Sequence, residues 1–283
     1  MFFLLRPGIV CYGAGEAGPV VRKHSCGGSG ATGEIMDKII KITLGFFILI
    51  LVVFVAFFSY MSYVDMTYRN SLTRTYSYTC TITTDSVLSN VTLFLPIPAD
   101  LQGNSPVVAQ ISSRNVSGVP GNWTLTLFDT GKATLLKVSA PTIGQLAING
   151  SAQTTSITFA VNASSPSLID THSPVENAAV FRPVQGIHGV ACPAGETKTG
   201  STPECFKYLT SSYADYTAAP SASVSISASL EATNSWRIFT PESNAYENQI
   251  TMLTIHGENH GWVTTLGWIE SGIGAYDAPT MSP

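Results

Sequence analysis

Charged residues are scarce in this chain. Asp, Glu, Lys and Arg make up 11% of its 283 residues, and the formal net charge is −4. From Met66 onward there are 9 basic and 14 acidic residues, so this part carries a net charge near −5. Such a surface repels phosphate groups, and the composition argues against nucleic acid as a partner.

Catalytic motifs are missing as well. The chain has no Gly-x-Ser-x-Gly elbow of the kind that hydrolases use, and no acidic pair stands out for glycoside hydrolysis. The motif Gly13-Ala-Gly-Glu-Ala-Gly18, followed by Asp37, formally matches a dinucleotide fingerprint. That fingerprint requires a preceding strand within a βαβ unit, but Arg6 and Pro7 interrupt the apolar run before it. We expect no catalytic residue and no cofactor, with a hydrolase of extracellular polymers as the enzymatic alternative.

One long apolar stretch, residues 42–64, contains no charged residue. At about 1.5 Å per residue, a helix of this length reaches roughly 34 Å and crosses the hydrocarbon core of a bilayer. Large side chains predominate at its C-terminal end, residues 57–64, whereas a signal-peptidase site needs small residues. We therefore predict a retained transmembrane helix in contact with lipid. Basic residues before the stretch predict a cytoplasmic N-terminus and an extracytoplasmic C-terminal part. They are Arg22, Lys23, Lys38 and Lys41.

We therefore divide the chain into a disordered cytoplasmic tail (1–41), the span (42–64), a stalk (65–74) and an outer β domain (75–283). Two alternatives stay open at the N-terminus. Residues 1–35 could precede the true start at Met36. A pilin-like leader, cut between Gly45 and Phe46, would instead release an apolar assembly helix.

The outer part alternates apolar and polar residues, which predicts β-strands. Strands are expected at 76–82, 91–95, 123–128, 133–138, 156–161, 224–230, 236–239, 250–255 and 262–269. Residues 129–132 read Asp-Thr-Gly-Lys and predict a hairpin turn. With no amphipathic helix between the strands, the pattern indicates a mainly β fold, an antiparallel β-sandwich. A long, loop-rich insertion is expected at about 164–222.

The cysteines of the outer part predict one disulfide. Cys192 and Cys205 bracket a loop rich in Pro, Gly and Thr, and a ring of about 14 residues would stabilise the fold by roughly 3 kcal/mol. Cys80 lies among strand residues, and we expect a buried thiol there. Cys11 and Cys26 precede the span.

Five glycosylation sequons follow the span and none precedes it, in agreement with the predicted orientation. Their acceptors are Asn90, Asn115, Asn122, Asn149 and Asn162.

Two further groups of side chains are candidates for binding. His256, Glu258 and His260 lie within five residues and could supply metal ligands, but their spacing differs from the helical metalloprotease motif. We interpret them as exposed residues of a hairpin loop and expect no metal. Trp262 and Trp268 are six residues apart, which places them on one face of a strand. They could stack on sugar rings, although burial is the favoured expectation for these two and for Trp236 and Tyr276.

The segments Asn90-Val-Thr-Leu-Phe-Leu-Pro-Ile-Pro98 and His260-Gly-Trp-Val263 resemble uncharacterised membrane-anchored surface proteins of archaea. The resemblance implies a location in the cell envelope and no particular activity. We expect a non-enzymatic, single-pass cell-surface protein whose β domain contacts envelope components or other copies of itself. The alternatives are a glycan-binding module that uses the late aromatic residues and a pilin-like filament subunit.

Overall fold

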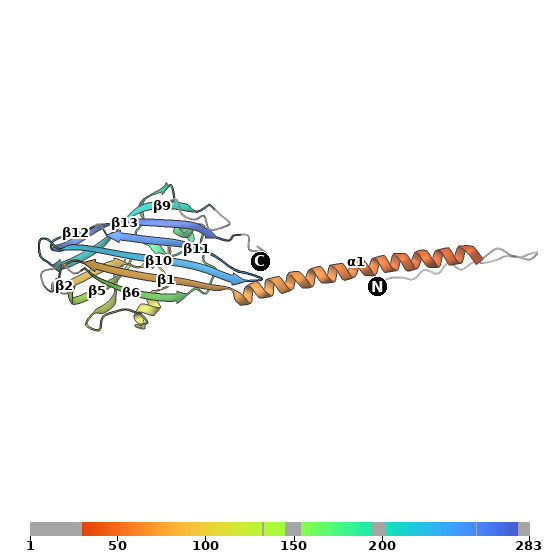
Figure 1. The fold of residues 1–283 in the computed structure, drawn as a ribbon, viewed down its shortest axis with the longest axis horizontal. Helices are drawn as coiled ribbons and strands as arrows, with labels where there is room; N and C mark the ends of the chain where they lie inside the picture. Colours follow the sequence, from red (N-terminus) through yellow and green to blue (C-terminus); the bar gives the residue numbers. More distant parts are fainter. Residues whose placement is uncertain (1–29, 132, 145–153, 194–201, 253, 277–283) are drawn as a thin grey trace, which may run out of the picture. The chain divides into compact units, whose positions relative to one another are not determined.

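The computed structural model describes residues 30–131, 133–144, 154–193, 202–252 and 254–276 (Figure 1). The glycine motif at 13–18, Cys11, Cys26 and the sequon at Asn149 lie outside the described residues.

Helix α1 (Gly30–Ser71) contains the apolar stretch. Of the described helices, it is the one that is long and apolar enough to cross a membrane, as the sequence predicts. The helix reaches back into the range 1–41 that was expected to be disordered. An ion pair of 2.6 Å between Lys41 Nζ and Asp37 Oδ2, four residues apart, supports this added part.

A mainly antiparallel β domain follows, which confirms the predicted fold class. Its strands are β1 (Thr73–Thr84), β2 (Leu88–Pro96), β3 (Pro98–Ala99), β4 (Thr124–Asp129), β5 (Thr134–Ile143), β6 (Thr155–Ser164), β7 (Val180–Phe181), β8 (Gln185–Val190), β9 (Glu204–Thr217), β10 (Ser223–Arg237), β11 (Pro241–Met252), β12 (Ile255–His256) and β13 (Asn259–Gly274). Eleven of them form one sheet in the order β4-β5-β2-β9-β13-β11-β10-β1-β6, with β8 beside β9 and β12 beside β10. Strands β3 and β7 form a separate two-stranded sheet.

The large sheet curls into a half-barrel, and one short segment contacts both of its edge strands. Helix α2 (Val108–Ser112) contacts both β4 and β6. Ser117, a few residues later, exchanges two backbone hydrogen bonds of 2.9 and 3.0 Å with Ala160 of β6. The chain then enters β4 beside the buried Trp123. The layers of the domain thus come from one continuous sheet that bends over its own core.

Most strands form where the alternation predicts them. In β1 and β10, for example, every second residue from Tyr76 to Ile82 and from Val224 to Leu230 is buried. Strand β10 also continues through Trp236, so the short strand expected at 236–239 is its end. The range 164–222 contains loops, helix α3 (Pro174–Asn177) and the short strands β7 and β8, but it also holds β9, which lies between β2 and β13.

The concave face of the sheet is filled by the chain between β6 and β8. Two buried asparagines satisfy its backbone groups. Asn234 Oδ1 accepts a hydrogen bond from Ile169 N (3.1 Å), and its Nδ2 donates to Ile169 O (2.8 Å). Asn248 Oδ1 accepts from Phe181 N (2.8 Å), while its Nδ2 donates to Trp268 O (2.9 Å) and Tyr208 Oη (2.8 Å). Unpaired polar groups in a core are costly, so these side chains fix where the filling segment lies.

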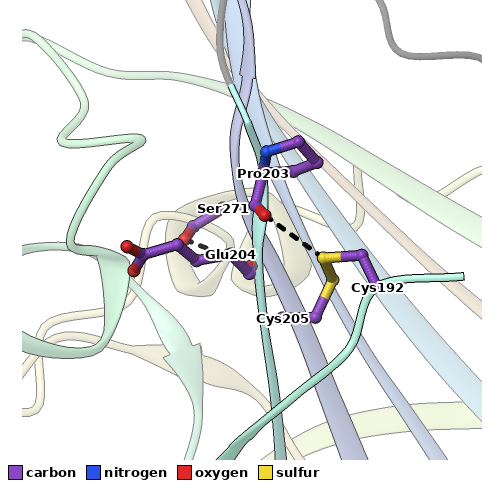
Figure 2. Close-up of a disulfide and its surroundings, with 5 residues drawn as sticks. All are labelled: Cys192, Pro203, Glu204, Cys205 and Ser271. Carbon is purple, nitrogen blue, oxygen red and sulfur yellow. Dashed lines mark hydrogen bonds between the residues drawn. A yellow bond between two sulfur atoms is a disulfide. The ribbon is translucent and has the colours of Figure 1, made fainter.

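The predicted disulfide is confirmed: Cys192 and Cys205 are bonded, with their Cα atoms 5.2 Å apart (Figure 2). Cys205 lies in β9 and pairs in register with Val190 at the end of β8. The disulfide therefore links the two ends of the connection between β8 and β9. Cys80 is fully buried, as expected, and burial raises the pKa of its thiol to about 12. The thiol therefore stays protonated and unreactive at neutral pH.

We predict that Asn248→Ala lowers the free energy of unfolding by about 3 kcal/mol, because it leaves the buried Phe181 N–H and Trp268 carbonyl without their partner. Urea unfolding of the full chain in detergent, followed by tryptophan fluorescence, measures the change. Asn122→Ala, at an exposed position, is the control and should change the free energy by less than about 0.5 kcal/mol. Equal midpoints for the two variants would contradict the role of Asn248.

Candidate interaction surface

Four aromatic side chains form a continuous row across the outward face of the sheet. Phe128 (β4), Phe94 (β2), Tyr213 (β9) and Trp262 (β13) make up this aromatic row. The alternation of each strand places them opposite the core, since their sequence neighbours Leu93, Leu95 and Ala214 are buried. Trp262 is 64% exposed and Phe128 is 46% exposed, while Phe94 and Tyr213 are half-buried.

Strand register brings the row together. Phe94 pairs with Tyr213, and Tyr213 pairs with Trp262. The centroid distances are 5.0 Å for Phe128 and Phe94, 5.6 Å for Phe94 and Tyr213, and 5.6 Å for Tyr213 and Trp262. Interplanar angles of 61°, 68° and 73° give edge-to-face contacts, an arrangement that stabilises aromatic pairs. The rings therefore hold one another in place, and Trp262, at the end of the row, is its most exposed member.

Cationic and ionic groups border the aromatic row. Lys137 of β5 places its ammonium group 5.8 Å from the centroid of Phe94. On the neighbouring cross-strand position, His260 Nδ1 lies 2.6 Å from Asp215 Oδ1, and His260 Nε2 lies 3.9 Å from Glu258 Oε2. The hydrogen bond to Asp215 raises the pKa of His260, because the carboxylate favours the protonated ring. An aromatic row beside charged groups suits a ligand or partner with both apolar and polar surface.

The three candidate metal ligands do not act together. His256 lies in β12, which pairs with β10, and its side chain is exposed. Glu258 follows in the turn at Gly257, and His260, the second residue of β13, pairs with Asp215. Within the described ranges, no group of three or more His, Cys, Asp or Glu residues is placed to hold a metal ion.

The four late aromatic residues have different environments. Trp262 and Trp268 share the outward face of β13. Trp268 is partly covered, with Lys207 Nζ 5.7 Å from its ring centroid. Trp236 is buried, and its Nε1 donates to Glu242 Oε2 at 3.1 Å. Tyr276 is half-buried, with its hydroxyl 2.7 Å from Thr171 Oγ1. The expected burial is thus confirmed for Trp236 and wrong for Trp262, which is exposed.

The described sequon acceptors are all exposed, as glycosylation requires. They are Asn90, Asn115, Asn122 and Asn162. Asn90 and Asn122 line one shallow depression between β2, β5 and β4. Asn115 and Asn162 both lie close to the bridge between Ser117 and Ala160. Asn90 and Asn122 thus lie in or beside strands β2 and β4, which carry Phe94 and Phe128, whereas Asn162 lies on the edge strand β6.

Sequence reasoning missed Phe94, Phe128, Lys137 and Tyr213 as parts of a surface. A signal was present for Phe94, because it lies between two core positions, Leu93 and Leu95, and must face outward. Tyr213 could not be placed in this way, since β9 was not recognised as a strand. Their proximity depends on strand order, which the local alternation does not contain.

Comparisons with known proteins identify no relative: no family model, no curated protein and no solved structure matches this chain.

We predict that Asp215→Asn lowers the pKa of His260 toward the ordinary value near 6.5. Because the pKa of His260 is higher in the folded state than in the unfolded state, its pair with Asp215 stabilises the fold fully at pH values below the unfolded-state pKa. This stabilisation is lost as the pH rises through the folded-state pKa. Histidine ring NMR signals followed against pH report the change. Glu231→Gln, an exposed carboxylate on β10, is the control. An unchanged His260 titration in Asp215→Asn would show that the pair does not form in solution.

Proposed function

We propose that this chain is a single-pass membrane protein whose β domain acts outside the membrane as a non-enzymatic interaction module. The apolar surface of α1 carries the proposal. From Met36 to Phe58 its large apolar side chains point in all directions, and each is at least 41% exposed. A helix that is apolar on all sides is unstable in water and requires lipid or protein around it. Its length suits a bilayer.

The orientation follows from charge. Lysines Lys38 and Lys41 lie at the N-terminal end of the apolar stretch, and short basic flanks stay in the cytoplasm. The β domain then faces the outside, where the disulfide between Cys192 and Cys205 is stable. The exposed sequon acceptors suit the same compartment.

The aromatic row is the surface that we propose for contact with envelope components or with other copies of the chain. Exposed aromatic side chains with a polar border are typical of protein interaction sites. Each member of the row lies on a hydrogen-bonded strand of the large sheet. The row is therefore formed before any partner binds.

Glycan recognition is the second candidate function, and the exposure of Trp262 favours it. An indole with an accessible face can stack on the apolar face of a sugar ring. His260 and Asp215, two residues farther along their strands on the same face, offer hydrogen-bonding groups.

The exposed helix is also compatible with a pilin-like filament subunit, in which copies of α1 would cover one another. N-terminal sequencing of the native protein separates the two models. A mature chain that begins at Phe46 would favour the filament, whereas an N-terminus before the span favours the anchor.

We predict that the full chain floats with liposomes after washes in high salt and alkaline carbonate. Leu51→Arg combined with Val55→Arg should abolish flotation, because each charge at the centre of a span costs about 2.5–3.5 kcal/mol. Leu266→Arg, at an exposed position of β13, is the control and should float. For orientation, protease added to intact cells should remove the β domain. Release of the wild-type chain by salt alone, or protection of the domain, would contradict the proposal.

For the glycan hypothesis, we predict that Trp262→Ala lowers the affinity for any sugar found on a glycan array by about tenfold, or about 1.4 kcal/mol. Phe239→Ala replaces an equally exposed aromatic residue and should leave the affinity unchanged. An array without hits for the wild-type protein would remove this candidate.

A further inference from the structure

The C-terminal turns of α1 are part of the β domain. Ser71 Oγ accepts a hydrogen bond from Arg237 N (2.9 Å) and donates one to Arg237 O (3.0 Å). One turn earlier, Tyr68 makes an edge-to-face contact with Trp236, with the ring centroids 5.8 Å apart. Val64 is only 7% exposed. This residue is the last of the uncharged stretch 42–64, so packing against the domain begins where the apolar stretch ends.

An exposed phenylalanine lies next to this junction. Strand β10 ends at Arg237 and β11 begins at Pro241, which leaves residues 238–240 as the tip of the hairpin. Phe239 in this tip is 65% exposed. The tip follows directly after the residue that Ser71 holds, and Val64 is seven residues before Ser71, or about 10 Å along the helix. Phe239 therefore lies close to the level at which the apolar stretch ends.

A second exposed apolar side chain belongs to the same end of the domain. Leu168 is exposed, and it lies in the loop whose Pro166 carbonyl accepts a hydrogen bond from Arg74 Nη1 (2.7 Å). The next residue, Ile169, is held by Asn234, three residues before Arg237 on β10. Two loops that are distant in sequence thus present large apolar side chains beside the end of α1.

The polar groups at this end suit a membrane interface. Asp65 pairs with Arg69 at 3.0 Å, and Glu242 accepts the indole hydrogen bond of Trp236, so both carboxylates have cationic or donor partners. Arg74 and Arg237 add positive charge that attracts lipid phosphates. Tyr60 and Tyr63, exposed on the preceding turns of α1, are typical of the aromatic belt at a bilayer surface.

We propose that this end of the β domain is seated on the bilayer that α1 spans, with Phe239 and Leu168 inserted among the lipid headgroups. The inference rests on the proposed membrane anchorage and adds a second, reversible lipid contact to it. Interfacial segments bury apolar side chains about 5–10 Å into the headgroup region. The hairpin tip lies close to the end of the apolar stretch, so Phe239 can reach this depth. The domain would therefore hold a fixed orientation on the membrane surface, with Trp262 directed away from it.

The test places a fluorescent reporter at two equally exposed aromatic positions. Phe239→Cys and Trp262→Cys are each made in a chain with Cys11→Ser and Cys26→Ser, and labelled with the environment-sensitive dye NBD. Cys80 is fully buried and stays unlabelled. Trp262 lies twelve residues before Gly274, which pairs with Asn244 near the start of β11, so the two sites are roughly 40 Å apart along the strands.

Each labelled chain is placed in phosphatidylcholine and phosphatidylglycerol nanodiscs with or without a lipid that carries a nitroxide near the top of its acyl chain. We expect the nitroxide to quench the dye at position 239 at least about twofold more strongly than the dye at position 262. Leu168→Cys, as a second reporter, should behave like position 239. Equal or absent quenching at 239 and 262 would overturn the inference.

Flotation of the same labelled chains with liposomes separates this inference from the proposed function. A chain that floats but shows no preferential quenching supports the membrane anchor and contradicts only the contact between the end of the β domain and lipid. A chain that does not float refutes both. Near-UV circular dichroism of each variant verifies the fold, which a change at an exposed position should leave intact.

Discussion

The hydrogen bonds of Asn234 and Asn248 are the interactions on which the arrangement of the β domain depends. A curled sheet leaves a concave face that must be filled, and here the filler is a connecting segment with its own backbone N–H and C=O groups. Ile169 and Phe181 pair with these two side chains. An apolar residue at either position would leave buried backbone groups unpaired. The amide side chains of Asn234 and Asn248 thus allow the segment between β6 and β8 to be buried in the core without unpaired backbone groups at Ile169 and Phe181.

Filling the concave face determines which aromatic side chains of the sheet are buried and which stay exposed. The inward positions of the long strands are used for packing against the filler, as in the contact between Tyr78 and Phe181, with ring centroids 6.0 Å apart. Aromatic residues at outward positions have no such cover. In the aromatic row the members pack on one another edge to face, which shields Phe94 and Tyr213 but leaves Trp262 exposed. The inward aromatic residues are therefore part of the core, and Trp262 on the outward face stays exposed to solvent.

The sequence predicts the local parts of this structure well and the long-range parts poorly. Strands with small polar residues opposite apolar ones, such as β1 and β10, are clear from alternation alone. Strand β9 is not, because its inward positions include Thr210 and Ser212 while its outward positions include Leu209. The shared face of Trp262 and Trp268 follows from their spacing. The contact of Trp262 with Tyr213 requires the strand order, and no local pattern contains it.

The junction between α1 and β1 shows why a helix and a domain that look separable in the sequence are joined in structure. The stalk expected at 65–74 is a continuation of α1 as far as Ser71, and only Leu72 separates the helix from β1. Ser71 and Tyr68 contact Arg237 and Trp236 of the β domain. An inserted residue at this point would rotate the helical face by about 100° and break both contacts. Val64 is at once the end of the apolar stretch and a buried residue of the domain. The exposed apolar surface of α1 therefore ends before Val64 on the face that packs against the domain. The length of the exposed apolar stretch is set by the fold of the domain as well as by hydropathy.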